Sequence, residues 1–213
     1  MDNRHILLKI RDLSIKNGVS SLSFEHICKS LLIDIDELKR FVPTEQVLVE
    51  KLLEFERETF SSIFDKYNFE GVNAIDILLT VSSEVSHRFN EITPSFTLEL
   101  QTMYPEVYQQ HIEQRIDFIF EKIKINIQKG IAQGMYRDDL SIELLSRLYI
   151  SRLIDLHNAV FFPPEKFSFK LLFEVMFENF IRGIATEEGL KYYSKRAGEF
   201  KKSKSTVQAT TQL

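Results

Sequence analysis

Two short amphipathic segments joined by a tight turn, within residues 21–49, constrain this 213-residue chain more than any other feature. Their apolar side chains recur every three or four residues, the spacing of one helical face: Phe24, Ile27 and Leu31, then Ile35, Leu38 and Val42. Ser23 can cap the first segment with its hydroxyl, and Pro43 ends the second, because proline disfavours helical geometry in the preceding residue. Two such helices form a helix-turn-helix, whose second helix can lie in the DNA major groove.

Helices are expected through the rest of the chain as well. Glycine (7) and proline (5) are rare, phenylalanine is frequent (18), and the apolar residues recur at helical spacing. We therefore predict an all-α protein. The expected helices cover residues 2–17, 44–67, 72–92, 95–103, 105–131, 141–160 and 165–186.

Further features surround the helix-turn-helix in a fixed order. They are Gly18-Val19, Leu22-Ser23, Ile27-Cys28 and the run from Leu38 to Thr44. Over about the first 55 residues this order resembles the TetR family of bacterial transcriptional regulators. The run from Gly134 to Leu140 is similar to the loop before the dimerisation helices of these regulators. The resemblance implies a three-helix head at residues 1–45 and a helical ligand-binding and dimerisation body at residues 46–190.

The resemblance also implies contacts with double-stranded, palindromic operator DNA, and the activity of a repressor that a small molecule releases. The residues implied for DNA binding are Ser23, Ile35, Asp36, Glu37, Lys39, Arg40 and Thr44. A carboxylate on the second helix could accept a hydrogen bond from cytosine N4, and lysine or arginine could bind guanine or phosphate.

Several residues favour an alternative in which the fold is kept and DNA binding is lost. Leu32 stands where the family has a glycine in the turn, and Glu45 stands where it has a lysine that contacts phosphate. Acidic residues outnumber basic ones over residues 1–56, and Asp34 opens the second helix. Because phosphate contacts supply much of the affinity for DNA, this charge favours a helical dimer that binds a ligand or a protein instead.

A group of mostly aromatic residues lies in the segments where such regulators enclose their ligand. The group consists of Phe60, Phe64, Tyr67, Phe89, Phe96, Met103, Tyr104 and Tyr108. An apolar cavity with a few phenol groups would suit a hydrophobic small-molecule effector. The alternative is that these rings simply fill the core of the body.

The last two long helices are apolar over most of their circumference, so both sides must be covered. We assign one side to the core of the body and the other to a second subunit, which gives a two-fold homodimer. The interface residues expected from this pattern are Leu145, Tyr149, Leu153, Leu156, Phe169, Phe173, Phe177 and Phe180.

Nothing in the sequence indicates an enzyme, a metal site or a cofactor. The histidines and the single cysteine, Cys28, lack metal-ligand spacing, and no catalytic constellation or phosphate-binding glycine loop is present. The N-terminus lacks a signal-peptide cleavage pattern, and no apolar run is long enough to span a bilayer. We therefore expect a cytoplasmic protein without membrane contact.

The C-terminal residues 191–213 differ in charge from the rest of the chain. They carry six basic residues against one acid and end in the polar run STVQATTQL. We expect a basic, flexible tail, with weak binding to nucleic acid or to the acidic body as the alternative.

Overall fold

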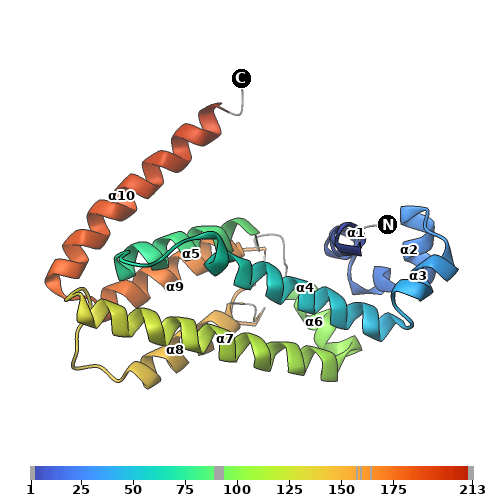
Figure 1. The fold of residues 1–213 in the computed structure, drawn as a ribbon, viewed down its shortest axis with the longest axis horizontal. Coiled ribbons are helices and arrows are strands. Elements are labelled where there is room, and N and C mark those ends of the chain that lie inside the picture. Colours follow the sequence, from blue (N-terminus) through green and yellow to red (C-terminus); the bar gives the residue numbers. More distant parts are fainter. Residues whose placement is uncertain (1–2, 89–93, 157, 159, 164, 211–213) are drawn as a thin grey trace.

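The computed structural model describes residues 3–88, 94–156, 158, 160–163 and 165–210, and every regular element in this part is helical, as predicted (Figure 1). The elements are α1 (Asn3–Asn17), the 3-10 turn η1 (Val19–Leu22), α2 (Phe24–Leu31), α3 (Ile35–Phe41), α4 (Glu45–Lys66), α5 (Ala74–Arg88), α6 (Pro94–Met103), α7 (Pro105–Ala132), α8 (Ile142–Asp155), α9 (Phe169–Ile184) and α10 (Glu187–Thr210). None of the described helices combines the length and the apolar character needed to cross a membrane.

Helices α1–α3 form a head at one end of the long helix α4 (Figure 1). Its hydrophobic cluster contains Ile6, Ile10, Val19, Leu22, Phe24, Ile27, Leu38 and Val42. The cluster continues past residue 45 onto α4, through Leu48 and Leu52, and onto α6 and α7, through Leu100 and Val107. The head is therefore packed directly on the helices of the body.

The body is organised around α7, which contacts α4, α5, α6 and α8. The largest fully buried side chains of its core include Ile63, Ile75, Ile127, Phe173, Ile181 and Ile184. Helix α8 ends at Asp155, earlier than predicted, because Asn158 accepts a hydrogen bond from the amide of Val160 at 2.9 Å and turns the chain. Local hydrogen bonding of this kind competes with helix continuation.

A close contact at the end of α7 fixes the loop that leads to α8. The ring of Tyr136 lies directly over Gly130, and its hydroxyl donates to Asn126 Oδ1 at 3.2 Å. Asn126 in turn donates to the carbonyl of Ala74 at 2.9 Å, which ties α7 to the start of α5. Burial raises the pKa of the Tyr136 phenol, so the hydroxyl stays protonated and remains a donor.

Residues 191–210 of the predicted tail are helical as part of α10, which projects away from the body (Figure 1). Its first half is held by Asp76 of α5. Tyr192 donates to Asp76 Oδ2 at 2.5 Å, and Arg196 Nε donates to Asp76 Oδ1 at 2.7 Å. Tyr193 is buried beside them in the core of the body. These partners lie more than a hundred residues apart, so the local composition of the tail could not reveal them.

Candidate functional site

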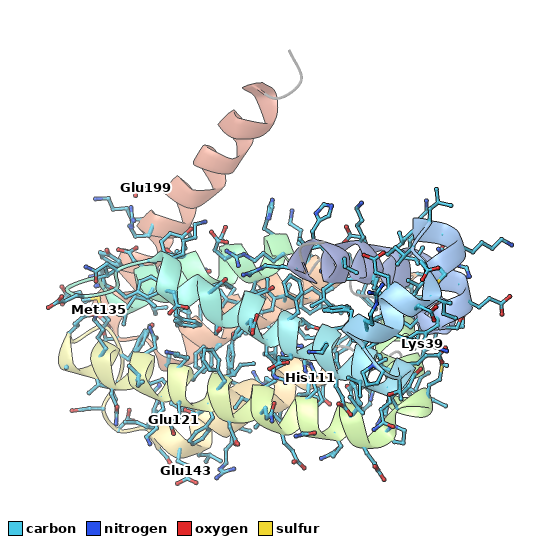
Figure 2. The ribbon with its side chains drawn as sticks, turned by 45° about the vertical axis from the view of Figure 1, so that its right-hand side comes forward. Lys39, His111, Glu121, Met135, Glu143 and Glu199 are labelled. Carbon is cyan, nitrogen blue, oxygen red and sulfur yellow. The ribbon has the colours of Figure 1, made fainter. Side chains whose placement is uncertain are left out.

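The exposed side of α3 lies at the free end of the head. Leu38 is buried in the head, whereas Ile35, Asp36, Glu37, Lys39 and Arg40 are exposed, so the structure brings these five predicted contacts together on one surface. Figure 2 labels Lys39 at this end of the molecule. A seven-residue helix with this orientation can present its side chains to a groove in DNA.

The remaining two predicted DNA contacts are helix caps. Ser23 Oγ accepts from the amide of His26 at 3.4 Å at the start of α2, and Thr44 Oγ1 accepts from the amide of Val47 at 3.2 Å at the start of α4. These bonds satisfy amides that would otherwise lack helical partners. Both hydroxyls therefore have a structural role, and contacts with DNA remain a prediction for them.

The acidic residues of the head also have local partners. Asp34 Oδ1 accepts from the amides of Asp36 and Glu37 at 2.8 and 3.2 Å, so this carboxylate caps the start of α3. Glu45 Oε1 accepts from the amide of Phe24 at 2.8 Å and thereby helps to cap α2. Glu45 therefore links the first turns of α2 and α4, a structural use that the sequence pattern did not show.

Leu32, in the turn between α2 and α3, is strained. Its φ is 54°, in the left-handed region, and its side chain is 92% exposed. Because a β-carbon clashes with the following carbonyl in this conformation, we expect Leu32→Gly to raise the free energy of unfolding by about 1 kcal/mol. Urea unfolding measures the change. Leu98→Gly, at an exposed helical position, should lower stability instead, and equal losses in both variants would contradict the assignment of strain.

Two neighbouring cavities lie along α4 and α7, and the second also reaches α6, α8 and α9. The outer cleft has a volume of about 370 Å³. The inner pocket is about 70 Å³ and is lined mainly by apolar side chains, among them Phe96, Leu100, Ile116, Ile119 and Phe169. The two cavities share Glu56, His111 and Arg115, so these three side chains form the boundary between them.

The boundary contains two polar pairs that join α4 to α7. Arg115 Nη1 lies 3.3 Å from Glu56 Oε1, and the Glu56 side chain is only 14% exposed. Arg57 Nη1 lies 3.0 Å from His111 Nδ1, and His111 is 3% exposed. Because a guanidinium can only donate, Nδ1 of His111 is the acceptor. Figure 2 shows His111 in the middle of the molecule, between Lys39 of the head and Met135 at the far end.

His111 is neutral at physiological pH. Burial lowers its pKa to about 4, and the nearby guanidinium groups of Arg115 and Arg57 act in the same direction, against the carboxylate of Glu56. A neutral imidazole can accept from Arg57 through one nitrogen and donate through the other. The two pairs together form a polar wall between the cavities. No nucleophile paired with a base is among these four side chains.

The chain shares its fold with solved structures that are described as transcriptional regulators. A transcriptional regulator from Saccharomonospora viridis, in complex with choline, has a TM-score of 0.64 at 17% identity, with 87% of this chain and 98% of that chain covered. A TetR-family regulator from Agrobacterium tumefaciens has a TM-score of 0.62 at 16% identity, with 85% and 96% covered. The fold is that of the TetR-family transcriptional regulators. The TetR-family regulator PfmR from Thermus thermophilus matches at 0.62 and 15% identity, with 83% and 97% covered. Neither a protein-family model nor a curated protein sequence matches the chain.

Within this TetR fold, the residues predicted for the pocket are divided among several places. Phe96 and Tyr108 line the inner pocket and Phe60 lines the outer cleft. Phe64 and Tyr67 belong instead to an aromatic cluster with Phe69 and Phe118, and the Tyr67 hydroxyl donates to Glu84. Tyr104 packs on the head, Met103 is exposed, and Phe89 lies outside the described residues.

The residues expected at the dimer interface require a correction. Five of them, Tyr149, Leu156, Phe173, Phe177 and Phe180, are at most 9% exposed in the single chain, and the other three, Leu145, Leu153 and Phe169, pack against the same core. The five buried residues leave little surface for a partner, whereas the other three are only partly buried, and a role at a dimer interface stays a prediction for them. The apolar side chains that remain exposed on α8 and α9 are Leu144, Leu148, Ile154, Leu171 and Val175. The predicted helices therefore expose an apolar face, but it is the opposite one.

Proposed function

We propose that this protein is a TetR-like transcriptional repressor that acts in the cytoplasm. In this proposal a homodimer binds palindromic double-stranded DNA through α3 and releases it when a small molecule occupies the cavities between α4 and α7. The TetR fold and the exposed surface of α3 support the first part. The cavities support the second part, because a pocket of mainly apolar walls with a few polar groups is typical of a ligand site.

The observation that carries the proposal is the position of α6 between the pocket and the head. Phe96, Thr97 and Leu100 of α6 line the inner pocket. On the same helix, Glu99 Oε2 accepts from the amide of Val19 in the head at 2.7 Å. Binding that displaces α6 would therefore act on the head through a single hydrogen bond and the packing around it.

The packing around this bond links the same two parts. A small cavity of about 30 Å³ lies between the head and the body, with Ser14 and Leu22 on the head side. Its body side is formed by Leu53, Phe96 and Leu100, which also line the inner pocket. Because the two cavities share walls, a ligand that changes one changes the other, and the affinities for ligand and DNA become reciprocally coupled.

Removing the hydrogen bond between Glu99 and the amide of Val19 should weaken DNA binding. In Glu99→Ala the Val19 amide loses its acceptor and the head is less firmly oriented, so we expect the affinity for operator DNA to fall about tenfold, the equivalent of one charge-assisted hydrogen bond. Fluorescence anisotropy with labelled operator measures the change. Glu106→Ala, an equal loss of charge at the exposed start of α7, is the control. An unchanged affinity in a folded Glu99→Ala protein would remove α6 from the mechanism.

The exposed bases of α3 are expected to supply the DNA contacts. Fragments upstream of the protein's own gene provide the target, and Lys39→Ala and Arg40→Ala should each weaken binding about tenfold or more. Lys191 is an exposed residue of α10. Lys191→Ala removes the same charge there and should leave binding within twofold of the wild type. Equal effects of all three variants would indicate non-specific attraction instead of a recognition surface.

A second candidate function is a TetR-fold dimer that binds a ligand or a protein and no DNA. Three exposed carboxylates, Asp34, Asp36 and Glu37, at the start of α3 favour it, because they oppose the approach of phosphate. Glu45, where related proteins have a phosphate-binding lysine, is engaged with the amide of Phe24. Absence of binding to any fragment at low salt, by a protein shown to be folded and dimeric, would establish this second function.

A further inference from the structure

The groove between α4 and α7 has two rims of different charge. Helix α4 carries Glu50, Glu54 and Glu58, four residues apart and therefore on one face of the helix. Helix α7 carries Gln110, Gln114 and Phe118 at the same spacing, so its rim is neutral. Between them these residues line the outer cleft and a neighbouring cavity of about 260 Å³, and the two cavities share Glu54, Arg57, His111 and Gln114. The two cavities therefore form one continuous groove with an acidic side.

The basic groups in this groove already have partners, whereas part of the acidic rim does not. Arg57 is engaged by His111 and Arg115 is paired with Glu56. Glu54 and Glu58 are exposed, and within the described part of the chain neither carboxylate has an ion-pair partner. The outer cleft thus contains three carboxylates against two guanidinium groups, and His111 adds no charge. An approaching cation would gain two new partners, whereas an anion would have to displace existing ones.

Aromatic rings add to the same preference. Phe60 and Phe118 both line the outer cleft, and their ring centroids are 5.7 Å apart in an edge-to-face arrangement. The face of an aromatic ring attracts cations, and an ammonium group without N–H donors depends on this attraction. Lys122 Nζ lies 5.1 Å from the Phe118 centroid, so one face of this ring already holds a cation of the protein itself.

Behind the acidic groove lies an apolar space. Across the boundary formed by Glu56 and Arg115, the inner pocket is lined by side chains such as Leu53, Ile112 and Ile116. Its volume of about 70 Å³ is small beside that of the outer cleft and suits a short hydrocarbon chain. The site as a whole is therefore polar and acidic outside and apolar inside.

We propose that the effector is an amphipathic organic cation with a short alkyl chain. Its cationic group lies in the outer cleft between the carboxylates of Glu54 and Glu58 and the rings of Phe60 and Phe118. Its chain passes Glu56 and enters the inner pocket. The role of this molecule as an effector rests on the proposed function, whereas its binding to the groove does not.

Calorimetric titration of the full chain with three probes of equal chain length tests the charge preference. Hexyltrimethylammonium should bind about tenfold more tightly than hexanoate or hexanol, because only the first offers a cation to the acidic rim. Ethyltrimethylammonium should bind less tightly than the hexyl probe, because it leaves the inner pocket empty. Equal or tighter binding of hexanoate would overturn the proposal, as would an affinity that does not depend on chain length.

Variants locate the binding site. The double variant Glu54→Gln with Glu58→Gln keeps the shape of the rim and removes its charge, so it should weaken hexyltrimethylammonium binding about fivefold to tenfold. The matched control is Glu143→Gln, because Glu143 is an exposed residue of α8 that lies outside the groove (Figure 2). This variant should bind hexyltrimethylammonium like the wild type. Similar affinity in the double variant and the wild type would place the cation elsewhere and overturn the proposal.

Adding the same probes to the complex of the protein with labelled operator DNA, and following anisotropy, separates this inference from the proposed function. If the cation binds in the groove and operator DNA is not released, the ligand class stands and the coupling between pocket and head is wrong. If hexanoate binds and releases DNA while the cation does not bind, the repressor stands and the ligand class is wrong.

Discussion

Gly130→Ala should lower the free energy of unfolding by about 3 kcal/mol or more. A β-carbon at position 130 would lie 2.0 Å from Cδ2 of Tyr136, and the ring cannot move away easily. Tyr136 is 2% exposed, its hydroxyl is bonded to Asn126, and its backbone amide donates to the carbonyl of Gly130 at 3.1 Å. Overpacking of a core site costs about 1–3 kcal/mol, and loss of the buried hydrogen bond adds to it.

Gly183→Ala provides the matched control for this prediction. Gly183 lies within α9, and no atom lies within 4 Å of a β-carbon placed there, so alanine should stabilise the helix by up to about 1 kcal/mol. Chemical unfolding of both variants measures the difference. A Gly130→Ala protein as stable as the wild type would contradict the packing of Tyr136 on α7, and with it the position of the loop between α7 and α8.

Leu148→Glu combined with Val175→Glu should convert the proposed homodimer, with its interface on the exposed apolar face of α8 and α9, into a monomer. The two side chains are about half exposed, one on α8 and one on α9, on the apolar face that their own chain leaves uncovered. In a self-complementary interface each substitution is present once in each subunit, so four glutamates would have to lose their hydration when the dimer forms. We expect the dissociation constant of the dimer to rise at least about a hundredfold, the equivalent of about 3 kcal/mol.

Sedimentation velocity over a range of protein concentrations measures the effect. Leu98→Glu is the control, because Leu98 on α6 is equally apolar and 62% exposed but lies outside the α8–α9 face. A double variant with the mass of a dimer at all concentrations would contradict the proposed interface. A monomeric wild type would contradict the homodimer itself.

The sequence was sufficient for the fold class and for the surface of α3 because both depend on local spacing. Leu38 is buried and Lys39 and Arg40 are exposed, as the period of the helix requires. Local spacing was not enough to choose a dimer face. Helices α8 and α9 are apolar on two sides, and periodicity alone does not tell which side meets the core of the same chain.

The cavity proposed for the effector was predicted only in part, because its polar wall depends on pairs that are distant in the sequence. Glu56 meets Arg115, and Arg57 meets His111, across more than fifty residues, and no motif connects them. The aromatic residues gave an incomplete signal, since Phe96 lines the pocket while Tyr67 donates a hydrogen bond to Glu84 of α5. The signal that could have located the groove was the regular spacing of Glu50, Glu54 and Glu58 along one helical face.

The salt dependence of DNA binding tests the central claim most directly. If Lys39 and Arg40 of both heads contact phosphate or bases, about four counterions are released, and the logarithm of the affinity should fall with the logarithm of salt concentration at a slope of about −3.6. Anisotropy titrations of the dimer on upstream fragments, from low to moderate salt, measure this slope. A slope near this value, with a fragment preference, is the result expected for a repressor. No binding at the lowest salt by a folded dimer would contradict it, and would show that the TetR fold of this chain serves a function without DNA.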